Sequence, residues 1–241
     1  MRRLFISDLH LESERSSQFR GLGWLLDQFP DHELYLLGDI TELWVGDDDD
    51  EPLAAAVKRL LRAAAQSRPV HLMHGNRDFL YGRALAEQTG VRILKDPTLL
   101  EDGVLLAHGD AFCTDDVEYQ QFRAMVRSAS WQEEILAKPL EERRAFGQAL
   151  RAQSRATNAN KATNIMDVNA ETLNEAIAEH RCRAIIHGHT HRPGRHQHDG
   201  AVRYVLGDWE RCGWFLEQRD TEFTLRCFSL APHCENETDR P

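Results

Sequence analysis

Five short apolar segments in the chain each end abruptly in polar residues. They occupy residues 4–7, 34–37, 70–73, 104–107 and 184–186. Each has the length of a buried strand, and an almost continuous apolar character is typical of a sheet covered on both faces. Between them, residues 17–28 carry apolar side chains at helical spacing, and the Ala-rich stretch 52–66 opens with a proline, which a first helical turn tolerates. This alternation predicts an α/β fold.

The polar residues after the five segments are candidate metal ligands. In α/β sheets, ligands gather outside the carboxyl ends of the strands, so we expect these side chains to converge. Carboxylate, imidazole and amide groups together suit divalent ions such as Mn²⁺, Fe²⁺ or Zn²⁺. Seven groups fit two ions that share a bridging aspartate better than they fit one ion. The seven are Asp8, His10, Asp39, Asn76, His108, His189 and His191.

The other histidines receive no ligand role. A single histidine on an apolar face is usually a satisfied core or surface residue. We therefore expect structural or surface positions for His32, His71, His74, His180, His187, His196, His198 and His233.

Residues 115–180 show no strand pattern and are predicted to be helical. Between Val117 and Met166 there are eight Lys/Arg and five Glu, a local charge of +3. We interpret this segment as a basic helical insert in a single domain that spans residues 1–241. After it, residues 202–206, 214–217 and 223–228 are expected to be further strands, and the polar tail 232–241 is expected to be frayed.

Composition and charge narrow the class of protein. The 241 residues carry a net charge of −10 and are 41% hydrophobic, which suits one large globular domain, or one domain with an insert. We find no apolar run of about 20 residues, and the N-terminal apolar run meets Asp8 too soon for a signal peptide, so we expect a cytosolic protein. The acidic balance argues against broad nucleic-acid binding. The five cysteines include no C-x-x-C and are interpreted as reduced thiols.

The ordered motifs resemble the calcineurin-like metallophosphoesterase superfamily. They are Asp8-x-His10, Gly38-Asp39, Gly75-Asn76-Arg77-Asp78, His108-Gly109-Asp110 and Gly188-His189-Thr190-His191. The resemblance implies a two-sheet sandwich flanked by helices. It also implies that Asp8, His10, Asp39 and His191 hold one metal ion. Asp39, Asn76, His108 and His189 would hold the other. Two such ions activate a water for attack on phosphorus.

Arg77 departs from the superfamily pattern. Most phosphomonoesterases of this group have a histidine there, which protonates the leaving alkoxide. A guanidinium is a poor proton donor but binds phosphate oxygens well. A leaving phosphate, with a second pKa of about 6, needs no such proton. Arg77 therefore favours cleavage of a pyrophosphate link; the alternative is that it only braces Asp78.

A closer resemblance is to the UDP-2,3-diacylglucosamine hydrolase family of lipid A biosynthesis, carried by residues 38–48, 76–78, 108–116 and 206–209. It implies that two Mn²⁺ ions support hydrolysis of UDP-2,3-diacylglucosamine to UMP and 2,3-diacylglucosamine 1-phosphate, at the cytoplasmic face of the inner membrane. The catalytic residues would be Asn76, Arg77 and His189. The substrate contacts it implies are Asn76, Arg77, Asp116, Ser154, Asn158, Lys161 and His189.

The insert is then expected to cap the site. Arg151, Ser154, Asn158 and Lys161 share one helix face by their spacing, and we add Arg151 to the predicted substrate contacts. The alternative is a solvated helix face. We expect acyl chains to contact a set of apolar residues. The alternative is that these residues belong to the ordinary core. These are Trp44, Val45, Phe79, Leu80, Phe122 and Met125.

Three other interpretations of the sequence are less favoured. The acidic run 47–51 lacks the spaced glycine and terminal glutamate of a calcium loop, so Asp47 and Asp48 are assigned to the family motif instead. A metallophosphoesterase acting on a soluble nucleotide diphosphate or polyphosphate is the main alternative function, although such a substrate needs no large cap. A metal-free scaffold is disfavoured because all seven ligands are present. The sequence leaves the oligomeric state undetermined.

Overall fold

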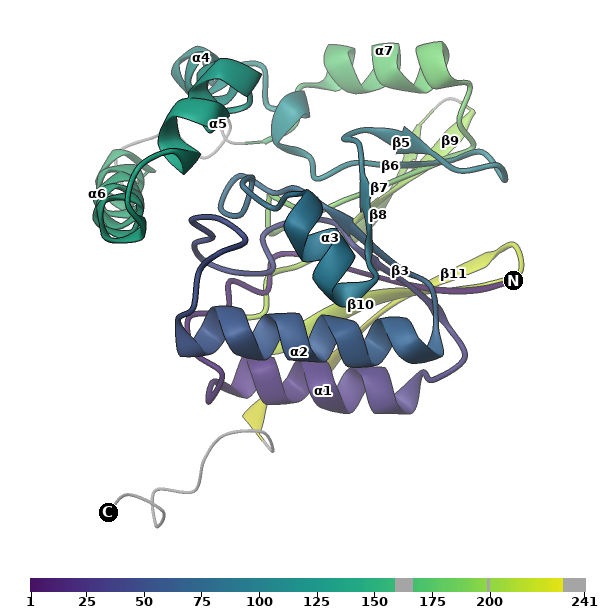
Figure 1. Ribbon diagram of the computed structural model, residues 1–241. Helices are drawn as coiled ribbons and strands as arrows, with labels where there is room; N and C mark the ends of the chain where they lie inside the picture. Colours follow the sequence, from purple (N-terminus) through teal and green to yellow (C-terminus); the bar gives the residue numbers. More distant parts are fainter. Residues whose placement is uncertain (159–166, 199, 232–241) are drawn as a thin grey trace.

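The computed structural model describes residues 1–158, 167–198 and 200–231, and in it two β-sheets pack face to face (Figure 1). In the six-stranded sheet, β1 to β4 are parallel, and β10 and β11 extend it antiparallel beyond β1. Its order is β11 (Glu222–Ser229), β10 (Cys212–Arg219), β1 (Arg2–Ile6), β2 (Glu33–Leu36), β3 (Val70–Met73) and β4 (Arg92–Leu94).

The second sheet has five strands. Parallel pairs join β6 to β7 and β7 to β9, while β5 and β8 are antiparallel edge strands. Its order is β5 (Thr98–Leu99), β6 (Val104–Leu106), β7 (Ala184–His187), β9 (Ala201–Val205) and β8 (Gly194–His198).

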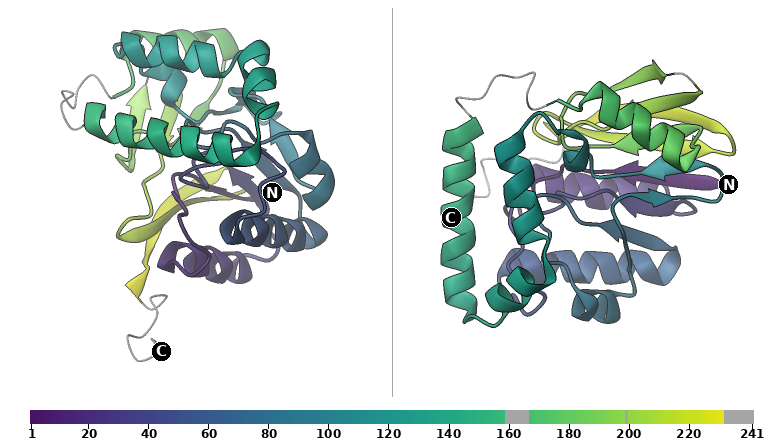
Figure 2. Two further views of the ribbon diagram at one scale, coloured as in Figure 1. Left: turned by 60° about the vertical axis from the view of Figure 1, so that its left-hand side comes forward. Right: turned by 90° about the horizontal axis from the view of Figure 1, so that it is seen from above.

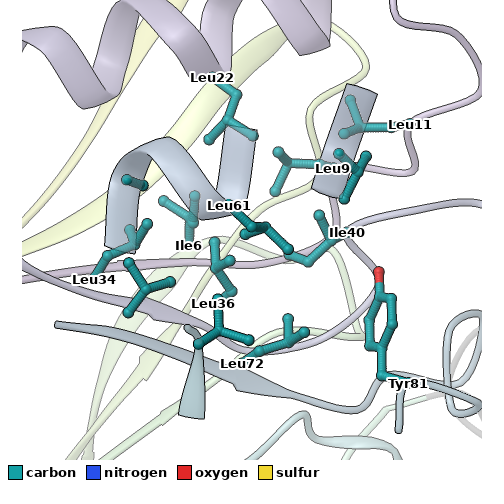
Figure 3. Close-up of a cluster of buried hydrophobic side chains, with 14 of the residues drawn as sticks. Ile6, Leu9, Leu11, Leu22, Leu34, Leu36, Ile40, Leu61, Leu72 and Tyr81 are labelled. Atoms are coloured by element: carbon teal, nitrogen blue, oxygen red, sulfur yellow. The ribbon is translucent and has the colours of Figure 1, made fainter. Parts of the chain in front are cut away.

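Three apolar clusters make the layers of the sandwich. Helices α1 (Ser17–Gln28), α2 (Pro52–Ser67) and α3 (Arg83–Thr89) cover the outer face of the six-stranded sheet, where Leu22 and Leu61 pack with strand residues such as Leu36 (Figure 3). A second cluster fills the space between the sheets. A third joins the other sheet to Leu173 of α7 (Ala170–His180). The order of layers is therefore helix, sheet, sheet, helix.

Three helices stand beside this sandwich. After the 3₁₀ turn η1 (Asp110–Phe112), the chain forms α4 (Val117–Val126), α5 (Ala129–Leu136) and α6 (Leu140–Asn158), which lie together at one end of the sheets (Figure 2). Helix α7, within the predicted insert 115–180, packs on the second sheet through Leu173. We call α4–α6 the cap; the single-domain boundary and the extent of the insert stay predictions.

The predicted α/β sandwich of two sheets flanked by helices is confirmed. The five apolar segments correspond to β1, β2, β3, β6 and β7, and the two predicted helices correspond to α1 and α2. The frayed tail 232–241 lies outside the described residues. In the described ranges, no helix is long and apolar enough to cross a bilayer.

Candidate metal centre

The predicted ligands lie on sharply turned backbone at the strand ends. Five of them have left-handed φ angles: Asp8 (56°), His10 (48°), Asp39 (53°), His189 (67°) and His191 (54°). Outside glycine, only two other described residues share that conformation. It costs an L-residue about 1–3 kcal/mol and persists where surrounding contacts enforce it, typically at functional sites. The turns therefore hold these side chains in a fixed geometry.

One group of ligand atoms comes from the loop after β1 and from the loop after β7. Atoms of Asp8, His10 and His191 all lie within 4.8 Å of one another. His10 Nε2 is 3.2 Å from His191 Nε2 and 3.8 Å from Asp39 Oδ2, and His191 Nε2 is 3.4 Å from Asp8 Oδ1. Oxygen and imidazole donors at this spacing suit a divalent ion.

A second group lies beside the first. Atoms of Asp8, Asp39 and His108 also fall within 4.8 Å of one another. Asn76 Oδ1 is 2.8 Å from both His108 Nε2 and His189 Nδ1. The two groups share Asp8, and Asp39 reaches both. All seven predicted ligand side chains thus meet at one place.

The electrostatics of the centre follow from burial and close charges. Burial would raise the pKa of Asp8, but a hydrogen bond and charge from His191 hold it well below its usual range. Burial would lower the pKa of His108, but Asp39, Asp110 and Asp8 raise it to about 9. Burial and the charge of His108 lower the pKa of His189 to about 4. The buried carboxylates thus attract positive charge, which a divalent ion supplies.

Outer contacts orient the imidazoles, and this supports a metal site. His108 Nδ1 lies 2.9 Å from the carbonyl of Leu37, and His10 Nδ1 lies 2.9 Å from Glu42 Oε2. Each ring can donate Nδ1–H outward, which leaves Nε2 free to ligate at the centre. The ligand atoms and the hydrogen-bond partners behind the imidazole rings therefore fit divalent metal ions.

Asp78 braces two ligand loops. Its buried carboxylate accepts hydrogen bonds from the backbone N–H of Asp39, Ile40, Thr41 and Gly75 at 2.7–3.3 Å. Burial and the charge of Asp39 raise its pKa to about 6. These bonds fix the turn that carries Asp39 against the turn that carries Asn76.

Arg77 points to the cap and not to Asp78. Its Nη1 donates to Ser154 Oγ at 3.3 Å, and its Nε lies 3.7 Å from Asp39 Oδ2. That buried Nε has no hydrogen-bond acceptor in the described part of the chain. No described contact supports the alternative in which Arg77 only braces Asp78, and the orphaned donor suits an incoming phosphate oxygen.

Two cavities meet at the centre. One, of about 270 Å³, is lined by metal-site residues such as Asp39 and His189. The other, of about 430 Å³, lies between the cap and the loops after β2 and β3. Both are lined by Asn76, Arg77, Tyr119 and Ser154.

The larger cavity is mainly apolar. All six residues predicted to contact acyl chains line it: Trp44, Val45, Phe79, Leu80, Phe122 and Met125. Trp131 and Ile135 of α5 and Phe146 and Leu150 of α6 also line it. The cap therefore encloses an apolar space directly beside a polar, charged one.

The predicted substrate contacts differ in their surroundings. Asp116 lines the polar cavity and also caps α4, accepting from Tyr119 N at 3.1 Å. Arg151 lines the apolar cavity, but its guanidinium is paired with Glu42. Asn158 is the last residue of α6, and Lys161 lies outside the described residues. The roles of these residues stay predictions.

Three residues near the centre were not assigned from the sequence. Tyr119 Oη donates to Asp110 at 2.6 Å, and its ring stacks near His189. Arg123 Nε donates to the same Asp110 at 2.9 Å, so α4 is tied to the loop that carries His108. Glu42 contacts His10. In the sequence, the one signal for Glu42 is that it is an acidic residue three positions after Asp39.

Four of the histidines that we predicted not to be ligands contact carboxylates or backbone carbonyls of the protein. His71 Nε2 is 2.7 Å from Glu33, and His32 Nε2 is 3.2 Å from Glu217. His74 Nε2 is 2.7 Å from the Tyr81 carbonyl. His187 Nδ1 is 2.9 Å from the carbonyl of Gly188. His233 lies outside the described residues.

The chain resembles known phosphoesterases and hydrolases. Residues 1–193 match the family described as calcineurin-like phosphoesterase. Over 223 residues, the chain is 45% identical to the UDP-2,3-diacylglucosamine hydrolase of Chromobacterium violaceum. This match covers 88% of this chain and 93% of that protein. It is 44% identical over 240 residues to the protein of the same name from Cellvibrio japonicus, covering 95% and 100%. A solved archaeal phosphodiesterase has a similar fold, with a TM-score of 0.51, 12% identity and coverage of 95% of this chain and 100% of that one.

Proposed function

The chain belongs to the calcineurin-like phosphoesterase family and, within it, to the UDP-2,3-diacylglucosamine hydrolases; from this we propose that it hydrolyses the pyrophosphate bond of UDP-2,3-diacylglucosamine. The products are UMP and 2,3-diacylglucosamine 1-phosphate, in a step of lipid A biosynthesis. The observation that carries the proposal is the junction of the two cavities, because a substrate that joins a diphosphate to two acyl chains needs a polar and an apolar space side by side.

The seven ligands are proposed to hold two divalent ions, with Mn²⁺ as the metal. Asp8, His10, Asp39 and His191 are assigned to one, and Asp39, Asn76, His108 and His189 to the other. When bound, such ions polarise a phosphoryl group and lower the pKa of a water towards 7. The residues themselves would position the ions, and Asp78 fixes the two turns that carry Asp39 and Asn76.

Arg77 is proposed to bind the diphosphate. Its buried Nε lacks an acceptor among the described residues, and its Nη1 reaches Ser154 of the cap. A fork of N–H donors at this point orients phosphate oxygens without giving up a proton. This is the behaviour needed when the leaving group is a phosphate and not an alkoxide.

The cap is proposed to enclose the acyl chains and to lie against the cytoplasmic face of the inner membrane. Its helices carry exposed Val117, Met125, Leu136 and Phe146. Exposed apolar side chains gathered on one element of a protein favour contact with a lipid or protein surface. We further propose one domain for residues 1–241 with a helical cap insert at about 115–180, of which α4–α6 form the part beside the metal centre.

Hydrolysis of a purified diacylated UDP-sugar tests the function. With Mn²⁺, the protein should release UMP and the diacyl sugar phosphate in equal amounts. Slow release of UMP together with fast turnover of an aryl monophosphate would refute the assignment. The alternative substrate class, soluble nucleotide diphosphates and polyphosphates, is favoured instead if these react faster than the diacylated substrate.

A further inference from the structure

Glu42 lies between the metal centre and the cap and contacts both. It sits in the loop after β2, three residues beyond Asp39. Its Oε2 is 2.9 Å from His10 Nδ1. Its Oε1 accepts from Arg151 Nε of α6 at 2.9 Å and also from Arg151 Nη2. A single carboxylate thus joins a predicted metal ligand to the helix that closes the site.

The three side chains are largely shielded from water. The exposed fractions are 20% for the His10 side chain, 17% for that of Glu42 and 10% for that of Arg151. A charge-assisted pair with two N–H donors on one carboxylate is both stronger and more directional than a neutral hydrogen bond. If the guanidinium left, the half-buried Glu42 charge would lose its main compensation.

The contact also sets the orientation of His10. With Nδ1–H donated to Glu42, the unprotonated Nε2 faces His191 Nε2 at 3.2 Å and Asp39 Oδ2 at 3.8 Å. A carboxylate behind an imidazole ligand fixes its tautomer and ring plane, and such outer partners affect metal affinity strongly.

We propose that Glu42 is a positioning residue that couples closure of α6, through Arg151, to the orientation of His10 as a metal ligand. The inference rests on the proposed metal centre and extends it. Coupling between two binding events is reciprocal. If closed α6 raises the affinity for an ion bound through His10, the bound ion must therefore favour closed α6 by the same factor. Arg151 then acts on the reaction through Glu42 in addition to any contact with substrate.

The same helix offers a matched control. Arg144 of α6 donates to Asp49 at 2.6 Å and to Asp50 at 2.5 Å. These contacts also fasten α6 to the segment after β2, but neither aspartate contacts a metal ligand in the described part of the chain. Loss of Arg144 therefore loosens the cap without disturbing His10.

Three full-length variants test the coupling: Arg151→Met, Arg144→Met and Glu42→Gln. Calorimetry on metal-free protein gives the Mn²⁺ affinity, and hydrogen exchange of α6 with and without Mn²⁺ gives cap closure. Nitrogen chemical shifts of the His10 ring report its tautomer. We expect Arg151→Met and Glu42→Gln each to weaken Mn²⁺ binding by about 10-fold and to mix the His10 tautomers. Their double variant should lose little more than either alone.

The control variant and the results that would refute the coupling give different patterns of exchange and affinity. Arg144→Met should speed exchange in α6 while Mn²⁺ affinity and the His10 tautomer stay as in the unmodified protein. If Arg151→Met speeds exchange but leaves Mn²⁺ affinity unchanged, Glu42 is only an anchor for the cap and the coupling is refuted. If the unmodified protein itself binds no Mn²⁺, the proposed manganese centre fails first, and the coupling fails with it.

Discussion

Arg77 Nη1 donates a hydrogen bond to Ser154 Oγ across 3.3 Å, and this contact joins the loop after β3 to α6 of the cap. Both residues line the polar and the apolar cavity. The guanidinium is therefore placed where the charged and apolar parts of one substrate would meet. Its orphaned Nε makes it the residue whose replacement best separates diphosphate chemistry from monoester chemistry.

Replacement of Arg77 by histidine should change the preferred leaving group. Arg77→His loses the phosphate fork, so hydrolysis of the diacylated UDP-sugar is expected to fall. The imidazole can protonate an alkoxide, so hydrolysis of an aryl monophosphate should rise relative to it. The measurement is the ratio of kcat/KM for the two substrates. Arg77→Gln is the control, because glutamine neither binds a phosphate as a cation nor donates a proton. An unchanged ratio in Arg77→His contradicts the leaving-group argument.

Asn76→Ala should remove a metal ligand while the fold stays intact. The Asn76 oxygen lies 2.8 Å from both His108 and His189, so its loss opens one side of the centre. Loss of a well-held ion is expected to cut kcat/KM by about 100-fold or more. Mn²⁺ affinity should fall in parallel, while the circular dichroism spectrum of the metal-free protein stays the same. A near-normal rate would remove Asn76 from the ligand set.

Phe122→Ala should weaken binding of acyl chains. Phe122 lines the apolar cavity on the cap side, and loss of its ring removes about 1.5–3 kcal/mol of burial. We expect KM for the diacylated substrate to rise by about 10-fold or more, with little change for UDP-glucosamine that carries no acyl chains. Leu99→Ala, a truncation at an exposed leucine of β5, serves as the control and should leave both KM values unchanged. Equal effects on the two substrates would assign Phe122 to the ordinary core.

The fold was predictable where burial dictates the pattern. The strands β1, β2, β3, β6 and β7 are covered on both faces, so their residues form continuous apolar runs. Edge strands carry no such signal: β5 has two residues, and most of β8 is exposed, with Arg195, His196 and Gln197 facing water. These strands are defined by pairing with a neighbour, which no local pattern reports.

The grouping of the candidate ligands was predictable because these residues follow directly after those buried strands. The contacts that support it were not, since they join segments distant in sequence. Arg151 and Glu42 are 109 positions apart, and nothing near either residue signals the pair. Sequence spacing put Arg151 on the same helix face as Ser154. Only the approach of α6 to the loop after β2 shows that an acidic residue meets it there.

Asp78→Asn should weaken both the fold and the metal centre. Each carboxylate oxygen of Asp78 accepts two backbone N–H groups, and an amide nitrogen cannot accept any. Two buried N–H donors would be left unpaired, at a cost of about 1–3 kcal/mol each. Urea unfolding of the metal-free protein measures the stability, and calorimetry measures Mn²⁺ affinity. If Mn²⁺ binds as tightly to Asp78→Asn as before, the brace does not position the ligands.

A second carboxylate, Asp102, clamps the two sheets together far from the metal centre. It lies in the turn between β5 and β6 of the second sheet, and it accepts from Arg3 Nη1 of β1 at 2.9 Å and from Gln218 Nε2 of β10 at 3.0 Å. Arg183, which precedes β7, donates to Asp102 Oδ2 at 2.8 Å, the same oxygen that accepts from Gln218. Burial would raise the pKa of Asp102, but the hydrogen bonds from Arg3 and Gln218 hold it below its usual value.

This depressed pKa predicts how the clamp depends on pH. A carboxyl group whose pKa is lower in the folded than in the unfolded chain stabilises the fold above the unfolded pKa, about 3.9, and loses that effect as the pH falls through the folded value. Asp102→Asn should therefore cost about 1–2 kcal/mol at pH 7, and the difference from the unmodified protein should shrink below about pH 4. Urea unfolding of metal-free protein across this range measures it. Asp31→Asn, at an exposed aspartate 3.6 Å from Arg2, should have no measurable effect. A difference for Asp102→Asn that stays constant down to pH 3 would mean that packing, and not the charge, holds the sheets at this point.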